Sequence, residues 1–144
     1  MLLYNNRMQQ SIFDAIRVIA TDVREWVQAR ADRTDYGADS LCGWCAIASA
    51  ELSKRLISAG IDCTICLSRV ASRGYHCFVM IDDYVLDVTA TQFREYEREP
   101  VVFLHSKEAE VNDYHIPVNE FSTAKALRVY QSKVHWPSYQ ICYA

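Results

Sequence analysis

Apolar residues recur every three or four positions near the start of the chain. From Gln9 to Arg30 this spacing predicts a long amphipathic helix, with charged residues between the apolar ones. The apolar positions are Ile12, Phe13, Ile16, Ile19, Val23, Trp26 and Val27. The stretch from Ala31 to Ser40 is polar and contains Gly37, so we expect a loop there.

A second helix is predicted after this loop. Residues Leu41 to Ala50 are almost all small or apolar, and the pattern continues to Gly60, a residue suited to closing a helix. Such a segment is expected to be central and buried. From Ile61 to Ser68 apolar and polar residues then alternate, which indicates a half-buried strand.

Two further runs predict an antiparallel hairpin. Tyr75 to Ile81 and Tyr84 to Val88 are rich in β-branched and aromatic residues, and Asp82 and Asp83 separate them as turn formers. We expect another turn over Ala71 to Gly74. The remaining candidates are a helical stretch over Phe93 to Glu99, a short strand at Val101 to Leu104 and a helix over Thr123 to Ser132.

The order of helices followed by strands predicts a single α+β domain over residues 1–144. An apolar fraction of 51% and a charged fraction of 23% are typical of a globular protein and exclude a disordered tail or a coiled coil. There is no internal repeat, low-complexity segment or Gly/Ser linker. The chain is therefore expected to form one hydrophobic core.

The net charge and the search for targeting signals indicate which classes of partner and which location to expect. The net charge of -3 offers no basic footprint for nucleic acid. Residues Met1 to Gln10 lack the apolar region of a secretory signal, and no window approaches the roughly 20 apolar residues of a membrane span. We therefore expect a cytoplasmic protein that binds neither nucleic acid nor membrane, and whose six cysteines are free thiols.

Four of the cysteines allow a zinc interpretation. Cys42, Cys45, Cys63 and Cys66 follow the pattern C-x2-C-x17-C-x2-C, which matches a four-cysteine zinc site. However, Cys63 and Cys66 belong to the alternating run, where residues three apart point to opposite faces. A zinc-stabilised interaction module is therefore kept as an alternative.

Cys42 and Cys45 also allow a redox interpretation. Cys42-Gly43-Trp44-Cys45 opens a helix, as in thiol-disulfide oxidoreductases, where the helix N-terminus lowers a thiol pKa. Such sites follow a buried strand in a βαβ unit, whereas the residues before Cys42 are polar. Thiol-disulfide exchange is the second alternative.

A third interpretation makes Cys45 a nucleophile. A thiolate at a helix N-terminus is stabilised by the helix dipole, and an imidazole beside it would activate it further. His76 lies on the first strand of the predicted hairpin. If Ile81 pairs with Tyr84, His76 shares a face with Asp87, which lies diagonally across within reach of the ring. Cys45, His76 and Asp87 can therefore form a catalytic triad, and Thr89 and Gln92 follow closely enough to support it.

The residues that carry this hypothesis also resemble a known family. The segments are Gly43-Trp44-Cys45 at the head of a helix that ends in Ala59-Gly60-Ile61, then His76-Cys77-Phe78-Val79, then Leu86-Asp87-Val88-Thr89. Together they resemble the core of the transglutaminase-like superfamily of cysteine enzymes. The resemblance covers about residues 41 to 93.

The resemblance implies a papain-like α+β core, in which a central helix carries the nucleophile and packs on a small antiparallel sheet. It implies Cys45 as nucleophile, His76 as general base and acid, and Asp87 as the residue that orients the imidazole. Members hydrolyse or transfer acyl groups at amide bonds. We therefore expect a peptidase or a protein glutamine deamidase that acts on a peptide or protein substrate and requires no metal or organic cofactor.

Overall fold

The computed structural model describes residues 6–34, 36–70, 74–109 and 117–133. It has an α+β fold with a five-stranded antiparallel sheet. The helices are α1 (Asn6–Thr34), α2 (Cys45–Ser58) and α3 (Ala124–Lys133), with 3-10 helices η1 (Ala90–Gln92) and η2 (Arg94–Tyr96). The strands are β1 (Thr64–Val70), β2 (Gly74–Ile81), β3 (Tyr84–Asp87), β4 (Val102–His105) and β5 (Pro117–Phe121).

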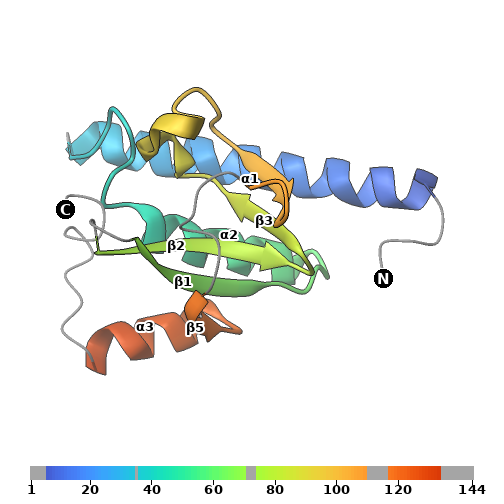
Figure 1. Ribbon diagram of the computed structural model, residues 1–144. Coiled ribbons are helices and arrows are strands. Elements are labelled where there is room, and N and C mark those ends of the chain that lie inside the picture. The colour runs from blue at the N-terminus through green and yellow to red at the C-terminus, as the bar shows by residue number, and fades with distance from the viewer. Residues whose placement is uncertain (1–5, 35, 71–73, 110–116, 134–144) are drawn as a thin grey trace.

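The strands run in the order β4-β3-β2-β1-β5 (Figure 1). β1 to β4 form a meander in which each strand pairs with the next one along the chain. β5 lies at the edge of the sheet opposite to β4 and pairs with β1, with a register shift between Leu67 and Ser68. β1 and β2 are therefore interior strands.

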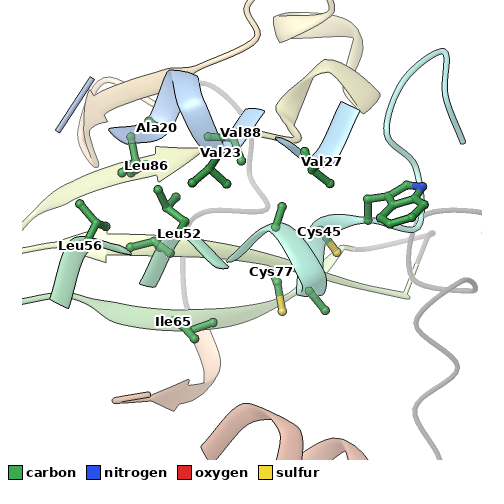
Figure 2. Packing of buried hydrophobic residues seen from close by; sticks show 14 of the residues in the cluster. Ala20, Val23, Val27, Cys45, Leu52, Leu56, Ile65, Cys77, Leu86 and Val88 are labelled. Carbon is green, nitrogen blue, oxygen red and sulfur yellow. The ribbon is translucent and has the colours of Figure 1, made fainter. Parts of the chain in front are cut away.

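One face of the sheet packs against α1 and α2. Helix α2 contacts both β1 and β2 as well as α1, and α3 lies beside α2 and β5 (Figure 1). The core between these layers is apolar (Figure 2). It includes Ala20, Val23, Val27, Cys45, Leu52, Leu56, Ile65, Cys77, Leu86 and Val88. The prediction of a buried second helix on an antiparallel sheet is confirmed.

A smaller apolar cluster covers the opposite face. It joins Phe78 of β2 and Val85 of β3 to Phe93 and Tyr96, which lie around η1 and η2. Because this cluster buries the second face of the sheet, the expected burial of β1 is corrected. β1 was predicted to be half-buried, but Cys66, on the face away from α2, is as fully buried as Ile65 on the helix side.

Several boundaries differ from the prediction. α1 continues to Thr34, because Ala31 is buried and carries the apolar stripe one turn past Val27. α2 begins at Cys45, because the residues before it form a tight loop. Only three residues of the expected helical stretch 93–99 form η2, and β5 was not predicted.

β1 begins at Thr64, three residues later than predicted, and ends at Val70. The remaining predicted elements agree within one or two residues. β2, β3, β4 and α3 match the predicted hairpin, strand and helix, while Gly74 of the expected turn belongs to β2. Residues 71–73 of that turn lie outside the described residues. Among the described residues, no helix combines the length and apolarity needed to cross a membrane.

Candidate functional site

A buried histidine–aspartate pair joins β2 to β3. Nε2 of His76 lies 2.6 Å from Oδ2 of Asp87, and the two side chains are only 1% and 2% exposed. The pair forms because Ile81 is opposite Tyr84 in the hairpin, as predicted, which leaves Asp87 diagonal to His76 on the same face. The predicted approach of the two side chains is therefore observed.

The other oxygen of Asp87 is held by Thr89. The backbone N–H of Thr89 donates to Oδ1 at 2.8 Å, and the Thr89 hydroxyl lies 3.2 Å from the same atom. Aspartate is unfavourable within a strand, and these contacts compensate it locally. The negative charge of Asp87 stabilises the charged guanidinium of Arg24. Burial has the larger effect, so the pKa of Arg24 is lowered.

Gln92 closes a ring of hydrogen bonds around the imidazole. Its Nε2 donates to the carbonyl of Thr89 at 2.9 Å and lies 3.2 Å from Nδ1 of His76. Since only the nitrogen end of the amide can donate to that carbonyl, Nδ1 must be the acceptor from Gln92. The proton of the neutral ring then resides on Nε2 and is donated to Asp87. Asp87, Thr89 and Gln92 thus fix one tautomer of His76.

Aromatic rings fix the plane of the imidazole. Phe93 meets it edge-on with ring centroids 4.8 Å apart, and Phe78 is stacked at 6.1 Å. On β1, Ser68 is directly opposite His76 in the register. The Ser68 hydroxyl is buried and has no hydrogen-bond partner among the described residues. His76 is therefore buried among both aromatic rings and polar side chains.

Cys45 is the first residue of α2. Its side chain is fully buried and belongs to the same apolar cluster as Cys77, the neighbour of His76 on β2 (Figure 2). No described side chain caps this end of the helix, at Trp44. Cys45 thus lies at the positive end of the helix dipole.

The loop before α2 is tightly constrained. Gly37, Leu41 and Gly43 have positive φ angles of 63°, 62° and 91°. Leu41 is fully buried in this conformation, which is uncommon for a bulky residue and is typical of functional sites. The indole N–H of Trp44 donates to the carbonyl of Tyr36 at 2.7 Å. This loop fixes the direction in which the chain enters α2.

Hydrogen bonds connect this loop to the segment that holds His76. The Thr91 hydroxyl donates to the carbonyl of Ser40 at 3.1 Å and accepts from Arg24 at 2.9 Å. Arg24 also donates to the carbonyl of Val88. Thr91 directly precedes Gln92, so the chain that leads to Cys45 and the chain that contacts Nδ1 of His76 lie side by side.

The alternatives for the other cysteines can now be compared with the fold. Cys66 lies in the cluster on the face away from α2, whereas Cys45 lies on the α2 face and Cys63 contacts Ser53 of α2. The predicted opposite orientation of Cys63 and Cys66 is therefore observed. Among residues 6–34, 36–70, 74–109 and 117–133, no cluster of three or more His, Cys, Asp or Glu side chains is arranged to hold a metal ion.

The redox alternative is not matched by the topology. In the part of the chain that the structure describes, the sheet is antiparallel without a βαβ unit, and the element that precedes α2 is the helix α1. Cys42 is half-buried, and the five described cysteines are not joined by disulfides. Burial raises the pKa of the Cys63 thiol, and raises the pKa of the Cys66 thiol to about 12. These two thiols are expected to be unreactive.

Thr89 and Gln92 were named from the sequence only because they follow Asp87. The sequence had no signal for the position of Gln92, which depends on the 3-10 helix η1 that ends at this residue. Comparison of the chain with protein-family models, curated proteins and solved structures finds no match in any of the three. Function is therefore inferred from the chemistry of these side chains.

Proposed function

We propose that this protein is a cysteine-dependent acyl-transfer enzyme of the transglutaminase-like, papain-like type. Cys45 is the nucleophile, His76 the general base and acid, and Asp87 the residue that orients the imidazole. One observation carries the proposal: the buried pair of His76 and Asp87, 2.6 Å apart, occupies Nε2 and leaves Nδ1 as the basic nitrogen. A ring held in this way is suited to take a proton from a thiol.

The position of Cys45 supports its role. α2 packs on the face of β2 that carries Cys77, whereas His76 shares the other face with Phe78. The loop before Cys45 is hydrogen-bonded to the segment that contains Gln92, which brings these two parts of the chain side by side. In the proposed reaction the thiol proton passes to Nδ1 of His76, and the sulfur attacks the carbonyl carbon of an amide. The backbone N–H of Cys45, at the helix N-terminus, is an oxyanion donor.

The second half of the reaction restores the enzyme. The C–N bond of the substrate breaks, the imidazolium returns its proton to the leaving amine, and a thioester remains on Cys45. Water, deprotonated by His76, then hydrolyses the thioester to a carboxylic acid and the free thiol. The substrate is a peptide or protein, and the products are those of a peptidase or of a protein glutamine deamidase.

We favour hydrolysis over transfer to a second amine, because nothing in the sequence indicates a dedicated amine acceptor. The mechanism uses only side chains and backbone of this chain together with water. It needs no metal or organic cofactor. Cys42 has no step in it, which separates this proposal from thiol-disulfide exchange.

Site-resolved alkylation tests the thiol–imidazole pair without a known substrate. The reduced protein is treated with iodoacetamide from about pH 5 to about pH 9, and modification of each cysteine is followed by mass spectrometry. We expect Cys45 to react well below the ordinary thiol pKa of about 8.5 and to lose this reactivity in His76→Ala. Cys66, whose pKa is raised to about 12, is an internal control that stays unmodified.

Cys42→Ser is the matched control among the variants. It removes the neighbouring thiol and leaves Cys45 and His76 in place, so the pH profile of Cys45 is expected to stay unchanged. A Cys45 that reacts no faster than the other described thiols, with His76→Ala having no effect, would show that the proposed function is wrong. Loss of Cys45 reactivity in Cys42→Ser would favour the redox alternative.

A further inference from the structure

We infer that Gln92 is a positioning residue whose amide stabilises the neutral form of His76 and so limits how far Nδ1 activates Cys45 in the resting protein. This inference rests on the proposed function, because it assigns Nδ1 as the atom that takes the thiol proton. It goes further by giving the resting state of the pair. Gln92 then acts as a restraint on the nucleophile.

The hydrogen bonds of Gln92 define this restraint. One N–H of its amide is held by the carbonyl of Thr89 at 2.9 Å, and the same nitrogen lies 3.2 Å from Nδ1 of His76. A neutral imidazole has a single lone pair on Nδ1. In the proposed reaction the Cys45 S–H needs this same lone pair, so the Gln92 N–H would compete with it.

The donor also changes the proton affinity of the ring. A hydrogen bond donated to the neutral imidazole stabilises that form and disfavours the imidazolium. Protonation of Nδ1 would place two donors, Nδ1–H and the Gln92 N–H, against each other. Rotation of the amide does not relieve this, because it would turn Oε1 of Gln92 toward the carbonyl of Thr89. The amide must instead move away.

The tautomer of His76 does not depend on Gln92 alone. Asp87 accepts at Nε2 and is itself held by the backbone N–H of Thr89. Removing the Gln92 donor is therefore expected to leave the ring oriented while making Nδ1 more basic. This direction is the opposite of what a merely structural role predicts, since general loosening of the site would reduce Cys45 reactivity.

Other charged groups around the ring stay constant in the comparison. The described titratable or charged side chains on the elements around His76 include Cys77 of β2, Asp87 and Tyr84 of β3, Cys66 of β1, Arg94, Glu95 and Tyr96 of η2, and Arg24 of α1, which interacts with the charge of Asp87. None of them is changed by substituting Gln92. A shift in the titration of His76 is then attributable to the lost or altered contact at Nδ1.

The test compares the wild type with Gln92→Met and Gln92→Glu in the full chain. Methionine has a similar length and donates nothing, whereas glutamate replaces the donor with a negative acceptor. NMR of the imidazole nitrogens gives the titration midpoint of His76, and iodoacetamide gives the pH profile of Cys45. Gln131→Met, on α3, is the matched control.

We expect the His76 midpoint to rise by about 0.4 to 1 pH unit in Gln92→Met, the equivalent of one hydrogen bond, and to rise further in Gln92→Glu. Alkylation of Cys45 near pH 6 is expected to become about 3 to 10 times faster in Gln92→Met. Gln131→Met should match the wild type. An unchanged or lowered midpoint, or slower alkylation, in folded Gln92→Met would overturn the inference.

Failure of the proposed function has a different signature. If His76→Ala leaves the alkylation of Cys45 unchanged, then the thiol and imidazole are not coupled, whatever Gln92 does. If His76→Ala abolishes the low-pH reactivity but Gln92→Met also reduces it, the acyl-transfer proposal stands and the restraint by Gln92 is wrong.

Discussion

Thr89 organises the imidazole site through its main chain. Its N–H donates to Asp87 and its C=O accepts from Gln92, so one residue positions two side chains that are hydrogen-bonded to the ring of His76. Backbone groups cannot be altered by side-chain substitution at Thr89 itself. The contacts are therefore best tested by changing the side chains that meet them.

Asp87→Asn is expected to move the proton of the neutral His76 ring from Nε2 to Nδ1. The N–H of Thr89 needs an acceptor, so the new amide would place its oxygen there and its NH2 group toward Nε2 of His76. The ring proton would then move to Nδ1, facing the donor of Gln92. We expect Cys45 alkylation near pH 6.5 to slow by up to about a hundredfold, the ratio between full thiolate and an ordinary thiol.

The control for this substitution is Asp83→Asn in the exposed turn of the same hairpin. It makes the same chemical change without touching His76, so the pH profile of Cys45 is expected to match the wild type. Equal reactivity in Asp87→Asn and Asp83→Asn would contradict an orienting role for Asp87. Unfolding by urea, followed in both variants, separates loss of stability from loss of activation.

At the scale of elements, the entry loop of α2 decides where Cys45 lies. Gly43 has a φ of 91°, and an added Cβ would lie 2.8 Å from the ring of Tyr36. Gly60, at the other end of α2, has a φ of 80° with open space around the same position. The two glycines share a left-handed backbone and differ in contact, which makes them a matched pair.

Gly43→Ala is therefore expected to disturb the site more than Gly60→Ala. The backbone strain alone costs about 1–2 kcal/mol at either position, and the collision with Tyr36 adds to it only at Gly43. We expect Gly43→Ala to lower both the free energy of unfolding and the low-pH alkylation of Cys45. Gly60→Ala should lower stability only; a similar loss of Cys45 reactivity in both variants would contradict this role of the loop.

The elements that the sequence predicts well are those set by local patterns. The β2–β3 hairpin follows from two apolar runs around Asp82, which has a φ of 51° in the turn, and its register places Asp87 beside His76. β5 was not predicted, because this short strand contains Asn119 and Glu120 and pairs only with the distant β1. A local pattern of apolar and polar residues does not indicate a pairing with a strand that is distant in the sequence.

The same distinction applies to the candidate site. Cys45, His76 and Asp87 could be chosen from residue type, order and spacing. The place of Gln92 could not, since it depends on the backbone path through η1. The conformation of Leu41 was equally hidden, because a positive φ at a leucine is imposed by surrounding packing and leaves no mark in composition.

For the whole molecule, burial of the sheet on both faces links stability to pH. Cys66 is fully buried, and its pKa is raised to about 12 in the folded protein. In the unfolded chain the same thiol ionises near pH 8.5. Above that pH the unfolded state has released a proton that the folded state retains, so rising pH favours unfolding.

We therefore expect the free energy of unfolding to fall above about pH 8.5, by at most about 1.4 kcal/mol per pH unit for this group. The loss should continue toward the folded pKa of about 12. Urea unfolding of the wild type and of Cys66→Val between about pH 7 and about pH 10 measures it, since valine removes the thiol without emptying the site. Parallel curves for the two proteins would contradict the assignment to Cys66.

The hydrogen-bonded ring around His76 is built from one continuous stretch of chain. His76, Asp87, Thr89 and Gln92 all lie between residues 76 and 92, so their contacts close short loops at little entropic cost. Cys45 instead reaches its place only when α2 docks on β2. If the proposed function is correct, the base can thus assemble with the hairpin during folding, while Cys45 is expected to stay an ordinary thiol until the long-range packing of α2 is complete.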